Sequence, residues 1–276
     1  MKVYDLHTHS TTSDGVLKPS ALLARASAKG VDTLALTDHD SVDGITEART
    51  AAAVEGIQLI SGVEISVSWY EHLFHIVGLD IDESNRTLLE GLEALRQRRD
   101  ERAAHMARQL AEVGIPTPLA GAKSHQTTKI LSRTHFARYL VEIGVVDSFD
   151  GAFTLFLNPG TPGHVPMQWA TLAEAVGWIK GAGGEAVIAH PARYRISDIH
   201  WNRFVQEFVA CGGIGIEVVC SNLDKCKIER FAQLARDFGL LASKGSDFHS
   251  PNSSRELGVL PPLPADLTPI WHKHAW

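Results

Sequence analysis

Short apolar segments that read as buried β-strands recur along this chain of 276 residues and alternate with amphipathic stretches of helical periodicity. Each segment is bounded by glycine or polar residues, as buried parallel strands are. Repeated strand–helix units predict an α/β fold, either a parallel sheet or a closed barrel. The expected strands are residues 3–6, 33–37, 58–61, 75–78, 186–189, 215–219 and 240–243, and the expected helices are 19–29, 43–54, 171–182 and 223–238.

Histidines and carboxylates follow several of these expected strands, in short separated motifs. Side chains at the carboxyl ends of several strands are typical of the active site of a barrel enzyme. Neutral imidazole with carboxylate is a ligand set for zinc, manganese or iron, and a cluster this rich can hold two or three ions. One histidine at a strand end is as often structural as ligating, but the whole series favours a metal-dependent hydrolase. The candidate ligands are His7, His9, Asp14, His39, Glu64, His75, His190, Asp247 and His249.

Composition excludes other classes of protein. The net charge of −6 gives no global basic field of the kind that nucleic-acid binders carry. No apolar run is long enough to span a membrane, and the N-terminus lacks the apolar core of a signal peptide. Cys211, Cys220 and Cys226 lack CxxC spacing and suit a reducing compartment. We therefore expect a cytoplasmic enzyme, with no stable protein partner implied.

The alternation of strands and helices stops between residues 82 and 166. We interpret this segment as a helical insertion that caps the active site of a barrel formed by residues 1–81 and 167–276. Its expected parts are a long helix at 86–113, a polar loop at 121–129, a second helix at 134–143 and a turn at 157–163.

The long helix of the insertion carries a dense basic run. These arginines could follow an RNA backbone, but acidic residues lie among them, so a salt-bridged helix face is favoured. The run consists of Arg96, Arg98, Arg99 and Arg102.

Eight short motifs of the chain occur together in one known family. They are Asp-Leu-His-Thr-His-Ser at 5–10, Ser-Asp-Gly at 13–15, Leu-Thr-Asp-His-Asp at 36–40, Gly-Val-Glu at 62–64, His-Ile-Val-Gly at 75–78, Ser-Arg-Thr-His-Phe-Ala-Arg at 132–138, Ala-His-Pro at 189–191 and Gly-Ser-Asp-Phe-His at 245–249. With them the chain resembles the polymerase and histidinol phosphatase (PHP) domain family. Within that family it is most similar to the bacterial nucleoside 3′,5′-bisphosphate phosphatases and 5′-to-3′ exoribonucleases.

This resemblance implies a distorted (β/α)7 barrel and an arrangement of the ligands. One ion would be held by His7, His9 and Asp247. Glu64 would bridge it to a second ion. The second ion would also take His75 and His190, and a third ion would take Asp14, His39 and His249.

The metal itself is expected to be manganese, with zinc or iron as alternatives. Many PHP relatives carry histidine where this chain has Asp14. An oxygen ligand in place of nitrogen favours harder ions and weakens the third position. We therefore expect two firmly bound divalent ions and a third whose occupancy is open.

The resemblance also implies phosphoester hydrolysis, in which metal ions activate water and neutralise the phosphoryl oxygens. His249 or His39 could protonate the leaving oxygen, and Asp40 could orient His39.

The insertion is expected to bind a substrate phosphate. Ser132, Arg133 and His135 offer a hydroxyl and charged or switchable donors for it. Relatives of this subgroup often carry lysine at the position of Thr161, so another residue could supply that charge here. The candidates for this role are Lys129 and Arg193.

Three functions remain open. The first is removal of the 3′-phosphate from nucleoside 3′,5′-bisphosphates, with 5′-to-3′ trimming of short 5′-phosphorylated RNA as the same chemistry on a longer substrate. The second is a histidinol-phosphatase-like activity on a small phosphate ester, which the insertion argues against. The third is a non-hydrolytic accessory protein, which the complete ligand set argues against.

Overall fold

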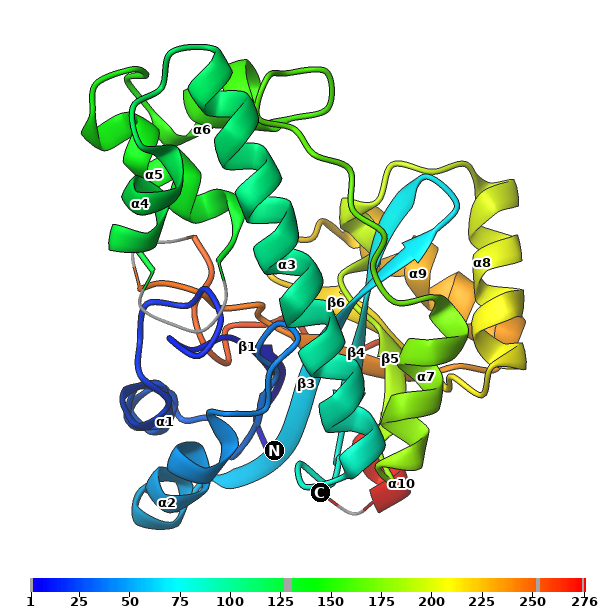
Figure 1. The fold of residues 1–276 in the computed structure, drawn as a ribbon. Coiled ribbons are helices and arrows are strands. Elements are labelled where there is room, and N and C mark those ends of the chain that lie inside the picture. The colour runs from blue at the N-terminus through cyan, green and yellow to red at the C-terminus, as the bar shows by residue number, and fades with distance from the viewer. Residues whose placement is uncertain (1, 127–130, 252–253, 275) are drawn as a thin grey trace. The chain divides into compact units, whose positions relative to one another are not determined.

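Seven strands of the described residues form one sheet whose spatial order is the chain order. This computed structural model describes residues 2–126, 131–251, 254–274 and 276. The strands are β1 (Tyr4–Thr8), β2 (Thr33–Leu36), β3 (Gln58–Trp69), β4 (His72–Leu79), β5 (Glu185–Ile188), β6 (Gly215–Cys220) and β7 (Leu241–Gly245). The sheet edges also meet, because Thr8 and Phe248 form a parallel bridge and the His9 N–H donates to Phe248 O at 3.0 Å. The sheet is thus nearly closed into a barrel, and the predicted fold class is confirmed (Figure 1).

One strand departs from the parallel arrangement that we predicted. β4 runs antiparallel to both β3 and β5, whereas β1–β2, β2–β3, β5–β6 and β6–β7 are parallel pairs. Only Tyr70 and Glu71 separate β3 from β4. A connection this short can form only an antiparallel hairpin, because a parallel crossover needs a dozen or more residues.

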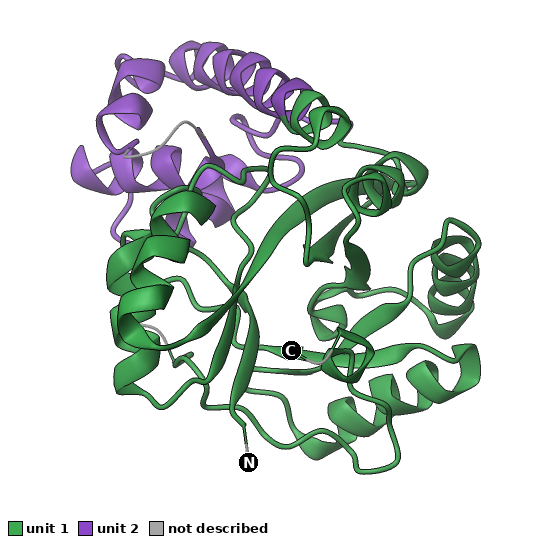
Figure 2. Cartoon of the chain, turned by 90° about the horizontal axis from the view of Figure 1, so that it is seen from below, with its two compact units in different colours: residues 1–92, 169–276 green, residues 93–168 purple. Residues whose placement is uncertain are grey.

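The chain forms two compact units, which Figure 2 shows in different colours. The barrel unit consists of residues 1–92 and 169–276, and the helical unit consists of residues 93–168. None of the described helices is both long and apolar enough to cross a lipid bilayer.

Helices cover the outside of the barrel unit and complete its core. Leu6, Ala35, Ile60 and Val187 come from four strands and pack together in one buried cluster. The helices of this unit are α1 (Pro19–Ala28), α2 (Ile45–Glu55), α7 (Leu172–Gly181), η2 (Pro191–Arg193), α8 (Asp198–Ala210), α9 (Lys225–Phe238) and α10 (Trp271–His274). Leu22 of α1 packs with Leu34 of β2 in another buried cluster, so apolar side chains of helices and strands form the core while polar side chains lie at the strand ends.

The helical unit has a hydrophobic core of its own. α3 (Arg86–Glu112) begins in the barrel unit and continues into the helical unit. It is followed by α4 (Pro118–Ser124), α5 (Arg133–Glu142), α6 (Phe149–Ala152) and η1 (Phe153–Leu157). Leu110, Phe136, Leu140 and Leu157 are fully buried or nearly so in this core. Part of the loop that we predicted at 121–129 is therefore helical, since α4 extends to Ser124.

Candidate metal centre

The first metal-ligand motif lies where β1 approaches β7. The register of β1 against β2 is irregular between Asp5 and Thr8, and within this stretch Leu6 belongs to the hydrophobic core. Asp5 accepts the backbone N–H of Ser246 at 2.8 Å, which ties β1 to the segment after β7. β7 passes so close that a Cβ at Gly245 would lie 2.2 Å from the His7 Cβ. The absence of a side chain at Gly245 is what allows this approach.

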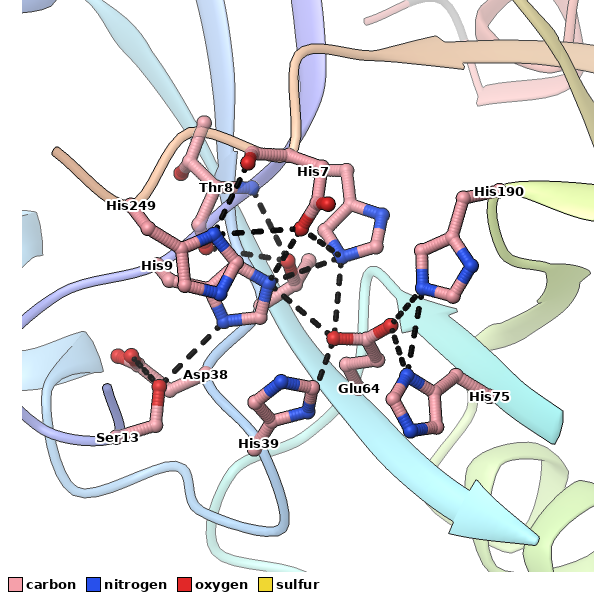
Figure 3. A network of polar contacts seen from close by, with 12 residues as sticks. His7, Thr8, His9, Ser13, Asp38, His39, Glu64, His75, His190 and His249 are labelled. Atoms are coloured by element: carbon pink, nitrogen blue, oxygen red, sulfur yellow. Dashed lines mark hydrogen bonds and ion pairs between the residues drawn. The ribbon is translucent and has the colours of Figure 1, made fainter. Parts of the chain in front are cut away.

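Glu64 on β3 occupies the middle of the cluster (Figure 3). Its side chain is fully buried, and imidazole nitrogens surround both carboxylate oxygens. Oε2 lies 3.2 Å from His7 Nε2, 3.2 Å from His9 Nε2 and 3.0 Å from His39 Nδ1. Oε1 lies 2.9 Å from His75 Nδ1 and 2.8 Å from His190 Nε2. One carboxylate thus faces histidines from several different strand ends.

The surroundings of Glu64 Oε2 are those of a metal ligand. This oxygen is buried and accepts no hydrogen bond from the described residues, although three imidazole nitrogens lie within 3.2 Å of it. His7 Nε2 and His9 Nε2 also lie only 3.0 Å from each other. Buried polar atoms are almost always satisfied, so donor atoms that converge on a buried oxygen with no hydrogen bond indicate space for a cation. The donor set therefore fits divalent metal ions.

The donor atoms fall into three groups, and within each group all of them lie within 4.8 Å of one another. The groups are His7, His9, Glu64 and Asp247; His39, Glu64 and His75; and His9, Asp14, His39 and His249. His190 joins the second group through Glu64 and lies 3.3 Å from His75. The structure thus brings all nine predicted ligands into one cluster. It differs from the expected grouping in that His9 and His39 each face two groups.

Three residues of the cluster have backbone conformations that side-chain-bearing residues rarely adopt. The φ angles are 46° at Asp40, 28° at His190 and 51° at Asp247. The N–H of each is held by a hydrogen bond to another residue of the centre. The acceptors are Glu64 O at 2.9 Å for Asp40, Glu217 Oε2 at 2.5 Å for His190 and His7 O at 2.8 Å for Asp247.

Burial and neighbouring charges separate the protonation states of the histidines. Burial lowers the pKa of His9 to about 3, with a further contribution from His249, and burial lowers the pKa of His190 to about 3 as well. Burial alone would also lower the pKa of His7, but the carboxylates of Glu217 and Glu64 raise it to about 10. At neutral pH His9 and His190 are therefore unprotonated, as metal ligands must be.

Two carboxylates of the cluster, those of Glu64 and Asp14, remain ionised. Burial raises the pKa of Glu64, but His39, His7 and His75 together hold it well below its usual range. Burial acts in the same direction on Asp14, where His249 and His39 lower the pKa of the carboxyl well below its usual range. Both groups can therefore supply anionic oxygen donors at neutral pH.

Several residues that support the cluster were not predicted from the sequence. Glu217 on β6 accepts a hydrogen bond from His7 Nδ1 at 2.7 Å. Asp38 accepts the Ser13 hydroxyl at 2.6 Å, and Ser13 Oγ lies 3.4 Å from His9 Nδ1. Glu217 could have been recognised in the sequence as the single acidic residue inside an otherwise apolar strand. In many proteins a hydrogen bond from the second ring nitrogen to such a residue orients a metal-binding histidine.

Asp247 divides its two oxygens between the histidines and two arginines. Oδ1 lies 3.1 Å from His9 Nε2, whereas Arg255 contacts Oδ2 at 2.7 Å. Arg193 also forms an ion pair with Oδ2. Arg193, which we considered as a phosphate ligand in place of lysine, thus contacts a candidate metal ligand instead.

The candidate proton donors lie at the edge of the cluster. The side chains of His39 and His249 are 16% and 27% exposed. His249 Nε2 lies 3.1 Å from Asp14 Oδ1. Asp40 accepts hydrogen bonds from the backbone and hydroxyl of Ser66 at 3.0 and 3.3 Å.

The predicted phosphate-binding residues belong to the helical unit, at the start of α5. Ser132 is the N-cap, and its backbone N–H donates to His135 Nδ1 at 3.0 Å. His135 is buried, and its Nδ1 accepts the hydrogen bond that forms this cap. The Arg133 guanidinium lies 5.6 Å from the centre of the Phe153 ring. Thr161 donates to Asn158 O at 2.8 Å, and Lys129 lies outside the described residues.

The basic run on α3 is only partly a salt-bridged face. Arg96 pairs with Glu93 at 2.6 Å, as predicted for such a face. Arg102 instead donates to Val165 O at 2.8 Å and lines a small pocket together with Arg99, Ser132 and Arg133. The prediction was therefore right for Arg96 and wrong for Arg102, because α3 buries that side of the helix against the rest of its unit.

Comparison with known proteins gives consistent similarities over nearly the whole chain. The family model for the PHP domain matches residues 5–186. A 3′,5′-nucleoside bisphosphate phosphatase of Chromobacterium violaceum is 46% identical over 98% of this chain and 95% of its own length. A 5′-3′ exoribonuclease of Haemophilus influenzae is 42% identical over 99% of both chains. The solved structure of an amidohydrolase from Chromobacterium violaceum, with bound sulfate and no metal, has a TM-score of 0.92 at 46% identity and covers 98% of this chain and 95% of that one.

Proposed function

Because this chain belongs to the PHP domain family, we propose that it is a metal-dependent phosphoesterase that converts nucleoside 3′,5′-bisphosphates to 5′-monophosphates. Family membership also confirms the resemblance that the motifs indicated. The observation that carries the proposal is Glu64 Oε2, a buried carboxylate oxygen with three imidazole nitrogens within 3.2 Å and no hydrogen bond from the described residues. The names of relatives with at least 42% identity support the substrate class.

We propose that two or three divalent ions occupy the three donor groups. The group of His7, His9, Glu64 and Asp247 is fully buried and suits a firmly held ion. Glu64 would supply an oxygen to this ion and another to an ion held with His75 and His190. The third group is more exposed and contains Asp14, which favours a harder ion. Manganese is the proposed metal, since it accepts mixed nitrogen and oxygen ligands; zinc and iron are the alternatives.

The chemistry is hydrolysis by direct attack of water on phosphorus. Bound cations would lower the pKa of water and neutralise the phosphoryl oxygens. We propose that His249 or His39 gives a proton to the departing ribose oxygen, because both are partly exposed at the edge of the cluster. Asp40 would orient His39, and its hydrogen bonds to Ser66 would fix the carboxylate for that role.

We propose that the helical unit serves as the substrate cap and binds the 5′-phosphate through Ser132, Arg133 and His135. Arg102 strengthens this assignment. Neither Arg102 nor Arg133 pairs with a carboxylate of the described residues, although they line the same pocket. Burial, with Arg133 and Arg99 nearby, lowers the pKa of Arg102 to about 10. Two neighbouring guanidinium groups, those of Arg102 and Arg133, that form no ion pair with the described residues favour a phosphate as their partner.

The same bond cleavage would act on RNA. A short RNA with a 5′-phosphate presents the same 3′-phosphoester, and the relative named an exoribonuclease supports this extension. We therefore propose nucleotides and short 5′-phosphorylated RNA as substrates. We also propose a cytoplasmic location, because Cys211, Cys220 and Cys226 are all free thiols, which suits a reducing compartment.

The test is phosphate release by the manganese-loaded protein. We expect fast turnover of adenosine 3′,5′-bisphosphate to 5′-AMP, and slow or no turnover of 3′-AMP, 5′-AMP and histidinol phosphate. Preference for histidinol phosphate would show that the protein is a small-molecule phosphatase of this family instead. Bound metal without turnover of any of these substrates would indicate a non-hydrolytic protein.

A further inference from the structure

Another buried carboxylate contacts the His7 ring at Nδ1, whereas Glu64 faces Nε2 of the same ring. Glu217 on β6 is fully buried and belongs to none of the three donor groups. Its Oε1 accepts from His7 Nδ1 at 2.7 Å, and its Oε2 accepts the His190 backbone N–H at 2.5 Å. The Cys220 thiol also lies 3.4 Å from Oε2. Glu217 therefore contacts one candidate ligand from β1 and one that follows β5.

Both contacts require an acceptor on Glu217. The backbone N–H of His190 can only donate. His7 must direct the lone pair of Nε2 towards Glu64 and the neighbouring donors, so its ring proton has to be on Nδ1, facing Glu217. Only a carboxylate offers an acceptor to both groups at once.

The hydrogen bond from His190 to Glu217 supports an unfavourable backbone conformation at His190. His190 has φ 28° and ψ 59°, a conformation that needs support from its surroundings. Glu217 bonds the N–H of that same residue, so it restrains the turn that carries the His190 ring towards Glu64.

We propose that Glu217 is a positioning residue that couples two metal positions, because it sets the ring tautomer of His7 and the backbone of His190 with one side chain. The inference rests on the proposed metal centre. It predicts that a single change at Glu217 weakens the group of His7 and the group of His190 together, although Glu217 itself binds neither ion.

Glu217→Gln isolates this role because the side chain keeps its size. An amide has one acceptor and one donor end. If the NH2 end faces His190, two donors oppose each other and the turn loses its restraint. If it faces His7, the ring proton moves to Nε2 and the lone pair for the metal is lost. Either orientation should weaken metal binding about 10- to 100-fold, the range found when such orienting partners are removed.

The experiment combines metal titration with nitrogen NMR of the imidazoles. In zinc-loaded wild-type protein we expect His7 to carry its proton on Nδ1. In Glu217→Gln we expect manganese binding to weaken at the position whose contact the amide nitrogen breaks, whereas Glu217→Ala, which removes both acceptors, should weaken both positions. Glu185→Gln is the matched control, because Glu185 is on the neighbouring strand β5 and contacts Lys273 and His274. It should bind manganese like the wild type.

The outcomes separate this inference from the proposed function. Wild-type protein that binds no divalent metal would overturn the metal centre itself. Wild-type binding with unchanged affinity in a folded Glu217→Gln would overturn the coupling. If that variant does not fold, the wild-type spectrum still decides, because a proton on His7 Nε2 in the zinc-loaded protein would contradict the assigned tautomer.

Discussion

Glu64 is the residue on which the proposed centre depends most, because five imidazole nitrogens lie within 3.2 Å of its two oxygens. Glu64→Gln keeps the volume but replaces one anionic oxygen by a donor group, which repels a cation. We expect loss of bound metal and a fall in turnover that exceeds the roughly 10- to 100-fold effect of an orienting partner. Metal content and phosphate release measure it. A variant that retains both would contradict the bridging role.

The protonation of His7 makes metal binding pH-dependent. Its pKa is raised to about 10, so the metal-free protein holds this proton at neutral pH and loses it only as the pH rises through about 10. Metal binding must displace the proton, and affinity should therefore rise about 10-fold per pH unit between about pH 6 and 8. His9 and His190, with pKa values of about 3, add no proton release in this range.

Calorimetric titration of manganese at several pH values measures this dependence. Repeating it in buffers of different ionisation enthalpy gives the number of protons released, which should be about one at neutral pH. Affinity that stays constant over this range would show that His7 is already unprotonated before the metal arrives.

At the scale of elements, the approach of β7 to β1 is what places His7. A methyl group at Gly245 would lie 2.2 Å from the His7 Cβ and 2.8 Å from its backbone nitrogen, so the two strands would have to separate. Gly245→Ala should destabilise the fold by roughly 1–3 kcal/mol, the usual cost of overpacking, and weaken metal binding. Urea unfolding and metal titration measure the two effects.

Gly177→Ala in α7 provides the control for this substitution, because no atom lies within 4 Å of the added methyl group. Replacing glycine by alanine inside a helix should leave stability unchanged or raise it by up to about 1 kcal/mol. Equal destabilisation by both substitutions would show that strand separation is not the cause.

The elements also show where local patterns were sufficient and where they were not. The predicted helix at 86–113 corresponds to α3, which ends at Glu112, because a long amphipathic run needs no distant partner to be recognised. α8 was not predicted, although Trp201, Phe204, Val205 and Phe208 follow helical spacing and are buried. The predicted direction of β4 was wrong, because the direction depends on a two-residue turn that apolar periodicity does not reveal.

At the scale of the whole molecule, the proposed function needs a contribution from each unit. The barrel unit carries the metal centre, and the helical unit carries Arg133. Arg133→Ala should raise KM for a 5′-phosphorylated substrate by roughly 10- to 100-fold, the effect of losing a hydrogen bond to a charged group. Arg138→Ala, an exposed arginine on the same helix, is the control. Steady-state kinetics with substrates that carry or lack the 5′-phosphate measure the difference. Equal effects on both substrates would show that Arg133 does not bind this phosphate.

The sequence by itself determined the identities of the candidate ligands and the fold class. Both are local properties: imidazole and carboxylate side chains follow apolar strands, and those strands alternate with amphipathic helices. Only the tertiary structure decided that β4 is antiparallel, that Glu217 joins His7 to His190, and that Arg102 lies beside Arg133. Each of these depends on register and packing between segments far apart in the chain. No periodicity encodes which buried acid will meet which imidazole, because that contact exists only once the barrel has closed.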